Sequence, residues 1–145
     1  MKRCLIFLCV VCVLGLVAGC SDGGGSDSDG TVVRAVLFYS PTCPHCQEVK
    51  ENVLPPLMNK YGSQLQIGGA DTSTPGGQAL YQSAIDYFGI QNRGVPTLII
   101  GDVVLIGSIE IPDQLPGLIE KGMSGGGLDW PAIPGLVVPE EFSSK

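Results

Sequence analysis

Residues 35–46 read Ala-Val-Leu-Phe-Tyr-Ser-Pro-Thr-Cys-Pro-His-Cys, an apolar run followed by a turn and a CxxC pair. The first five residues are continuously apolar, which is typical of a strand covered on both faces of a sheet. We expect this strand to occupy residues 31–39 and to end at Ser40-Pro41-Thr42. The following pattern, from Cys43 to about Tyr61, predicts a helix that is interrupted or kinked at Pro55-Pro56.

The segments that follow alternate between strand and helix patterns. A weaker strand is expected over residues 64–70, and a polar loop is expected over 71–77. A helix over residues 78–88 would place four apolar side chains near one face, namely those of Leu80, Ala84, Ile85 and Phe88. Residues 97–100 and 103–106 are β-branched runs joined by a Gly-Asp pair, which predicts a hairpin.

The C-terminal part of the sequence predicts one more helix, from Pro112 or Asp113 to about Lys121. Beyond it, residues 128–145 are too rich in proline for regular structure, but they contain apolar side chains that could pack over the domain as a strap: Trp130, Ile133, Leu136 and Val137. The whole order is strand, helix, strand, helix, hairpin and helix. It predicts an α/β fold with a mixed sheet of about four strands, the first two parallel neighbours.

The N-terminal residues carry a secretory signal pattern, in which Lys2 and Arg3 precede an apolar run over residues 5–17. That run is shorter than the roughly 20 residues needed to span a bilayer. It ends in Leu16-Val17-Ala18-Gly19-Cys20, which resembles the lipobox of bacterial lipoproteins. The resemblance implies cleavage before Cys20 and lipid attachment to its thiol. An ordinary cleaved signal with an incidental cysteine is the alternative.

These features divide the 145 residues into four parts. We expect a signal peptide over residues 1–19, a lipid anchor and flexible Gly/Ser/Asp tether over 20–30, one domain over 31–123, and a Gly/Pro-rich tail over 124–145. Charged residues make up 15% of the chain, and the net charge is -6, which argues against nucleic-acid binding and against polybasic attachment to anionic lipid.

The cysteine count narrows the chemistry. Of the six cysteines, Cys4, Cys9 and Cys12 lie in the expected leader, so a lipidated Cys20 would leave one CxxC pair, Cys43 and Cys46. The chain contains a single histidine, His45, and structural zinc usually takes four ligands. We therefore expect no metal and no cofactor other than a redox-active Cys43–Cys46 disulfide.

A CxxC pair in the first turn of a helix suits thiol–disulfide exchange. Unpaired backbone N–H groups at the helix start favour a thiolate, so Cys43 is predicted to attack and Cys46 to resolve the mixed disulfide. Pro44 suits a position whose N–H would have no helical partner. His45 can add further stabilisation of the thiolate, although a solvent-exposed residue without a role is the alternative.

The run from Phe38 to Cys46, followed by Gly94-Val95-Pro96-Thr97, resembles the thioredoxin superfamily over about residues 32–121. The resemblance implies a minimal thioredoxin-like fold in which Pro96 is cis and lies against the CxxC, while the backbone of Val95 pairs with an extended substrate. The Pro-His dipeptide resembles that of periplasmic disulfide-forming oxidases. Residues 39–44 also resemble glutaredoxins, but Gly107-Ser108 replaces the Gly-Gly that helps hold glutathione there.

We therefore expect an extracytoplasmic, lipid-anchored thiol–disulfide oxidoreductase with a role in cell redox homeostasis. Its expected substrates are the thiols and disulfides of secreted or membrane proteins, a membrane-embedded thiol protein is an expected redox partner, and the expected state is a monomer. Two alternatives stay open. One is a thioredoxin- or glutaredoxin-like reductant, and the other is a non-catalytic adaptor in which Cys43–Cys46 is only a staple.

Overall fold

The computed structural model describes residues 31–138. The expected signal peptide, Cys20 and the tether lie outside these residues. In chain order the elements are β1 (Val33–Tyr39), α1 (Pro44–Glu48), the π-helix η1 (Val49–Val53), α2 (Leu54–Tyr61), the 3-10 turn η2 (Gly62–Gln64), β2 (Leu65–Asp71), α3 (Pro75–Phe88), β3 (Thr97–Ile100), β4 (Val103–Ile106) and α4 (Gly107–Ser124).

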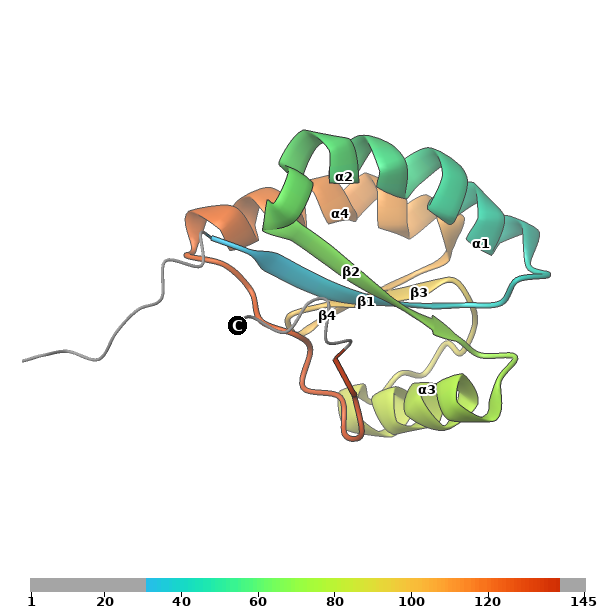
Figure 1. The fold of residues 1–145 in the computed structure, drawn as a ribbon. Coiled ribbons are helices and arrows are strands. Elements are labelled where there is room, and N and C mark those ends of the chain that lie inside the picture. Colours follow the sequence, from blue (N-terminus) through green and yellow to red (C-terminus); the bar gives the residue numbers. More distant parts are fainter. Residues whose placement is uncertain (1–30, 139–145) are drawn as a thin grey trace, which may run out of the picture.

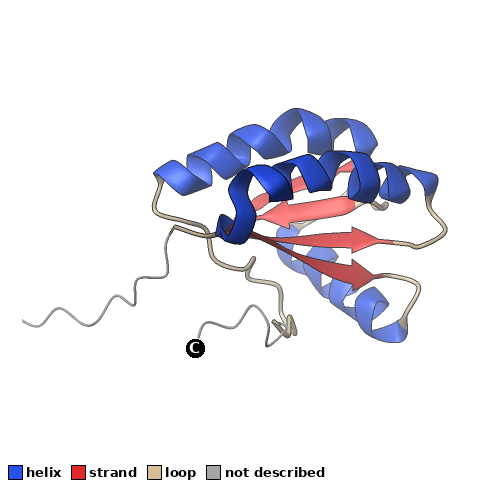
Figure 2. Cartoon of the chain, turned by 45° about the horizontal axis from the view of Figure 1, so that its top comes forward, coloured by secondary structure: helices blue, strands red, loops and turns tan. Residues whose placement is uncertain are grey.

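The four strands form one mixed sheet in the order β2-β1-β3-β4. β1 pairs with β2 in parallel and with β3 in antiparallel fashion, and β3 forms the predicted hairpin with β4. Helices α1, α2 and α4 lie on one side of the sheet, and α3 lies on the other (Figures 1 and 2). This strand order, with the cysteine pair at the β1–α1 junction, is a thioredoxin-like fold and confirms the predicted fold class.

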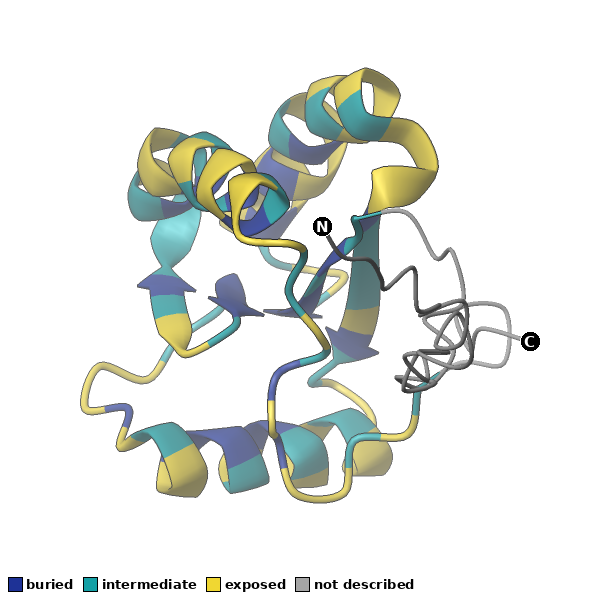
Figure 3. Cartoon of the chain, turned by 90° about the vertical axis from the view of Figure 1, so that its left-hand side faces the viewer, coloured by how far each residue is buried: buried dark blue, intermediate teal, exposed yellow. Residues whose placement is uncertain are grey.

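The alternation of side chains along β1 produces two hydrophobic cores. Val33, Ala35 and Leu37 face the cluster formed with α2 and α4, whereas Val36 and Phe38 face the cluster formed with α3. All five side chains are buried. Figure 3 shows the buried segments on the strands and on the inward sides of the helices. The continuous apolar run thus has the two-sided burial that its sequence predicts.

The first helical segment is interrupted, but before the prolines rather than at them. Residues Val49–Val53 form a π-helix, in which the N–H of Leu54 donates to the carbonyl of Val49. Pro55 and Pro56 then lie in the first turn of α2, where a missing N–H leaves no helical hydrogen bond unmade. The prolines therefore start a new helix instead of kinking an existing one.

Helix α3 begins three residues earlier than predicted, inside the segment expected to be a loop. The reason is an N-cap: the Thr74 hydroxyl accepts a hydrogen bond from the N–H of Gly77 at 3.1 Å, and Pro75 occupies the first turn. Its buried positions are Tyr81, Ala84 and Ile85. The predicted Leu80 and Phe88 are only partly buried.

Helix α4 begins at Gly107, five residues before the predicted start at Pro112. The Glu110 carboxylate accepts a hydrogen bond from the N–H of Ile106 at 2.8 Å and so caps the earlier turn. Prolines 112 and 116 remain inside the helix. Proline normally disfavours a helix interior, but here one face is fully buried, comprising Ile111, Leu115, Ile119 and Gly122.

The segment after α4 returns along the domain as a strap. Leu128 forms an isolated parallel bridge with Val33. Further along, Trp130, Ile133 and Leu136 pack against the α3-side cluster, as the sequence suggested. Val137 does not, because its side chain is 84% exposed.

Helix α4 offers a matched test of its buried face. Ile119 is fully buried, whereas Ile109 lies on the exposed side of the same helix and its side chain is 84% exposed. We expect Ile119→Ala to lower the free energy of unfolding by about 2–5 kcal/mol, and Ile109→Ala to change it by less than about 0.5 kcal/mol. Denaturant titration measures both, and similar losses for the two variants would contradict the described packing.

Candidate functional site

The two cysteines lie where β1 passes into α1. Cys43 is the N-cap residue, with extended backbone (φ -86, ψ 117), and its carbonyl accepts hydrogen bonds from the N–H groups of Cys46 and Gln47, each at 3.1 Å. The N–H of Cys43 in turn donates to the carbonyl of Ser40 at 3.2 Å. The backbone thus fixes Cys43 at the start of the helix, one turn from Cys46.

The cysteines differ in their access to solvent. Cys43 is half-buried, whereas Cys46 is fully buried, and both are free thiols. Only Cys43 can therefore meet a bulky reactant without rearrangement of the fold. This difference agrees with an attacking Cys43 and a resolving Cys46.

Residues far apart in the sequence meet at Cys43. Its Sγ donates to the carbonyl of Val95 at 3.6 Å, and the Val95–Pro96 peptide bond is cis. The carbonyl of Pro96 accepts a hydrogen bond from the N–H of Gly107 at 2.8 Å, which ties this loop to the start of α4. The structure therefore brings Val95 and Pro96 beside the CxxC, where the family resemblance had put them.

The surroundings set the two thiols apart in acidity. Partial burial opposes ionisation of Cys43, but hydrogen bonds from the Cys46 thiol and from the N–H groups of Cys46 and His45 outweigh it and lower the pKa of Cys43. Burial raises the pKa of Cys46 to about 11, despite a hydrogen bond with the Ser40 backbone and the nearby Lys50 charge. Cys43 therefore ionises at a lower pH than Cys46.

His45 faces solvent but is not isolated. Its Nδ1 lies 3.1 Å from the hydroxyl of Ser108, in the first turn of α4. This contact orients the imidazole relative to the CxxC turn. Sequence reasoning treated Ser108 only as a departure from glutaredoxins, because nothing in the sequence shows that it lies beside His45.

Lys50 and Tyr39 form a cation–π contact near Cys46. Lys50 lies one turn after Cys46, and its Nζ is 4.0 Å from the centre of the Tyr39 ring. The ring holds the ammonium group where its charge favours ionisation of Cys46. Sequence reasoning missed Lys50, although its spacing of four residues from Cys46 on a helix was a usable signal.

Two buried hydroxyl groups support the loop before Pro96, and sequence reasoning missed both roles. The Tyr81 hydroxyl donates to the carbonyl of Gly94 at 2.6 Å and accepts from the N–H of Gly94 at 2.9 Å. The Thr97 hydroxyl also donates to the Gly94 carbonyl at 2.6 Å. A tyrosine on the apolar face of a predicted helix was the available signal, because a buried tyrosine hydroxyl needs a partner.

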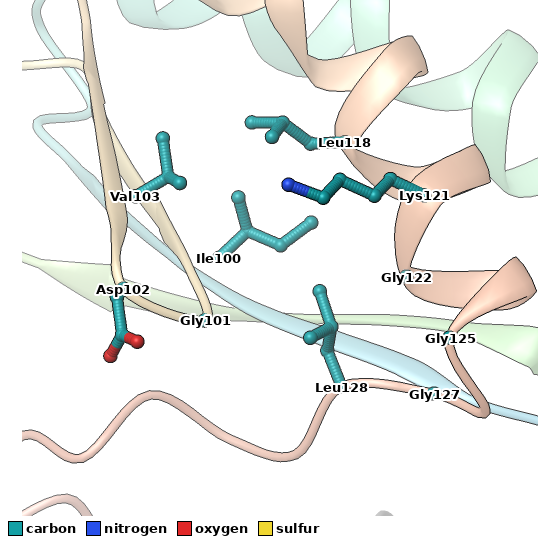
Figure 4. Close-up of a pocket in the computed structure, with 10 residues that line it drawn as sticks. All are labelled: Ile100, Gly101, Asp102, Val103, Leu118, Lys121, Gly122, Gly125, Gly127 and Leu128. Carbon is teal, nitrogen blue, oxygen red and sulfur yellow. The ribbon is translucent and has the colours of Figure 1, made fainter.

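A pocket lies away from the cysteines. It has a volume of about 310 Å³ and lies between the β3–β4 turn and the C-terminal half of α4, where Ile100, Leu118 and Leu128 line it and Lys121 reaches across it (Figure 4). Ile100 ends β3, whereas Pro96 precedes that strand. The pocket therefore belongs to the end of the sheet opposite the CxxC.

Among residues 31–138, no group of three or more His, Cys, Asp or Glu side chains is placed to hold a metal ion. Within the same residues, no helix combines the length and the apolar character needed to cross a bilayer.

Comparison with known proteins gives similarity at the level of structure. No protein-family model matches the sequence, and no curated protein matches it. A solved thioredoxin from Thermus thermophilus is 24% identical over 66% of this chain and 77% of its own, with a TM-score of 0.48. The germline-specific thioredoxin Deadhead of Drosophila melanogaster is 18% identical over 62% and 80%, with a TM-score of 0.46.

Glutaredoxins are also among the similar structures. The buckwheat glutaredoxin, solved as a glutathione complex, is 20% identical over 64% of this chain and 78% of its own, with a TM-score of 0.42. The assignment of the thioredoxin-like fold rests on the strand order and on the place of the cysteine pair.

The pKa difference between the cysteines predicts the order of their alkylation. Thiolate is the reactive form, so the alkylation rate of Cys43 should rise with pH and reach half its maximum at a lower pH than that of an unperturbed cysteine thiol. Cys46 should stay unmodified at neutral pH. Iodoacetamide labelling followed by peptide mass spectrometry measures both, and preferential labelling of Cys46 would reverse the assigned roles.

A variant separates the causes of this reactivity. Cys46→Ala removes the thiol that donates to Cys43, so the pKa of Cys43 should rise and the alkylation profile should move to higher pH. A profile that stays in place would show that the backbone N–H groups alone set the acidity of Cys43.

Proposed function

We propose that this protein is a thiol–disulfide oxidoreductase that exchanges disulfides with other proteins. The observation that carries the proposal is the asymmetric pair: a half-buried Cys43 with a lowered pKa beside a fully buried Cys46. A thioredoxin-like fold with a CxxC pair at the β1–α1 junction supports the same function.

The chemistry needs only sulfur atoms from the two proteins. The Cys43 thiolate attacks one sulfur of a substrate disulfide, the substrate S–S bond breaks, and the second substrate sulfur leaves as a thiolate. Cys46 then loses its proton and attacks the Cys43 sulfur, which releases the first substrate sulfur and forms the Cys43–Cys46 disulfide. The substrate gains two electrons and this protein loses them, and the reverse sequence oxidises a substrate dithiol.

The loop before Pro96 supports an extended protein substrate. Its Val95 residue is half-buried beside Cys43, and Pro96 offers no N–H that could compete for the sulfur. An extended segment that pairs with the Val95 backbone would present its own sulfur to Cys43.

The direction we propose is oxidation of substrates. Interactions that favour the Cys43 thiolate stabilise the reduced form of the pair, and a stabilised reduced form makes the disulfide a stronger oxidant. The contact of His45 with Ser108 keeps the imidazole beside this turn, where a charged ring would act in the same direction.

We also propose that the protein acts outside the cytoplasm, on a lipid anchor at Cys20. The signal pattern and the lipobox-like run support this location. The described chain enters β1 at Val33, whereas Cys43 follows the other end of that strand, about 20 Å away. An anchor at Cys20 would therefore connect to the end of β1 opposite the CxxC, which leaves the site open to proteins that project from the membrane or are secreted.

Trapping of mixed disulfides tests the exchange reaction. Cys46→Ser keeps the attacking sulfur and removes the resolving one, so its adducts with protein substrates should persist and should be released by dithiothreitol. Cys43→Ser is the matched control and should give none. Non-reducing electrophoresis with mass spectrometry detects the adducts, and equal adduct yields from the two variants would argue against attack by Cys43.

Lipid attachment has its own test. Radiolabelled fatty acid should enter the wild-type protein in a bacterial host and should not enter Cys20→Ala. That variant should be found in the soluble extracytoplasmic fraction, because a protein without acyl chains lacks the anchor. Equal labelling of both proteins would remove Cys20 as the attachment point.

A further inference from the structure

Tyr81 and Thr97 carry the only polar side chains that are hydrogen-bonded to the Gly94 peptide group among the described residues. Both are buried: Thr97 is fully buried, and Tyr81 is 6% exposed. Their hydroxyl oxygens lie 3.3 Å apart. One small polar cluster, which we call the hydroxyl pair, is therefore enclosed in an otherwise apolar core.

Contacts with Phe38 position both residues of the hydroxyl pair. Thr97 begins β3 and pairs across the sheet with Phe38 of β1. The Phe38 ring packs against the Tyr81 ring, with centroids 5.0 Å apart. The two hydroxyl groups are therefore carried by β3 and α3, and both residues contact Phe38 of β1.

The loop before Pro96 contacts the sulfur of Cys43 through the Val95 carbonyl. Gly94 directly precedes Val95, whose carbonyl accepts from the Sγ of Cys43 at 3.6 Å. Gly94 itself has no side chain that could pack in the core, so hydrogen bonds to its peptide group are a direct way to fix its position. A shift of Gly94 would move the Val95 carbonyl relative to Cys43.

We infer that Tyr81 and Thr97 are positioning residues, which hold the Gly94 peptide group so that the Val95 backbone stands at the correct distance from Cys43 for substrate pairing. The inference rests on the proposed function and assigns to that function two residues outside the CxxC turn and the Pro96 peptide. The hydroxyl pair acts through Val95 and does not touch the reacting sulfurs.

The substitution Tyr81→Phe removes one hydroxyl and keeps the ring that packs on Phe38. Without it the Gly94 N–H loses its acceptor, and the Val95 backbone becomes less well placed. Disulfide exchange with an unfolded protein substrate should slow about fivefold, the equivalent of one hydrogen bond. Thr97→Val removes the other hydroxyl at nearly constant volume and should act in the same direction, and the double variant should be slower than either.

Alkylation of Cys43 gives a second readout, in which the variant should react more readily although its exchange with protein substrate is slower. A carbonyl that accepts from the thiol favours the protonated form, so a displaced Val95 carbonyl should let Cys43 ionise more readily. The pH profile of iodoacetamide labelling should therefore move to lower pH in Tyr81→Phe, while exchange with the protein substrate becomes slower. General loss of stability would not produce this pair of changes.

The control is Tyr87→Phe, because Tyr87 lies on the same helix and is 56% exposed. It should match the wild type in both assays, and circular dichroism checks that every variant is folded. If Tyr81→Phe does not fold, Thr97→Val carries the same two readouts. Wild-type values for both readouts in folded Tyr81→Phe and Thr97→Val, even with a lower Tm, would overturn the inference.

Failure of the proposed function would look different. In that case the wild-type protein itself would show no exchange, and the labelling profile alone would decide the positioning role. A shift to lower pH in Tyr81→Phe would then support it, and an unchanged profile would overturn it.

Discussion

The structure depends on the burial of β1 on both faces. Alternate side chains of this strand enter two separate cores, so neither its register nor its direction can change without exposing one of them. The last residue of β1 is Tyr39, and Cys43 follows within one short turn. The position of the Cys43 sulfur is therefore fixed by a strand that is buried on both faces.

The same strand also fixes what Cys43 meets. Phe38 pairs with Thr97 in the antiparallel β1–β3 ladder. The residues just before Thr97 therefore lie at the same end of the sheet as the C-terminal end of β1. This juxtaposition puts the Val95 carbonyl against the Cys43 sulfur and leaves Cys46 beneath it, shielded from solvent. One half-exposed thiol of lowered pKa and one buried thiol of raised pKa follow from this arrangement.

Much of this arrangement can be predicted from local sequence. The apolar run before the cysteines indicated a two-sided central strand, and the Gly101-Asp102 pair indicated the hairpin. Element boundaries were harder, because caps decide them: Glu110 begins α4 before Pro112, and Thr74 begins α3 inside a segment of loop-like composition. Pro112 suggested the start of this helix, but it lies inside α4, where one face of the helix is buried.

Apart from Val95 and Pro96, which the family resemblance placed beside the CxxC, the contacts between distant residues could not be predicted from the sequence. Tyr81 meets Gly94 across 13 residues, and Ser108 meets His45 across 63. Neither pair has a local pattern, since each depends on how α3 and α4 pack against the sheet. The cysteines could be found from their spacing alone, whereas the groups that orient their surroundings required the fold.

We propose that Cys43 and Cys46 form a reversible two-electron couple whose reduced form is stabilised. Equilibration of the protein with mixtures of reduced and oxidised glutathione, followed by acid quenching and mass determination, measures the reduction potential of the pair. We expect one two-electron transition, at a potential nearer about -120 mV than about -270 mV. A pair that stays oxidised to below about -300 mV, as structural disulfides do, would contradict the account and identify Cys43–Cys46 as a staple.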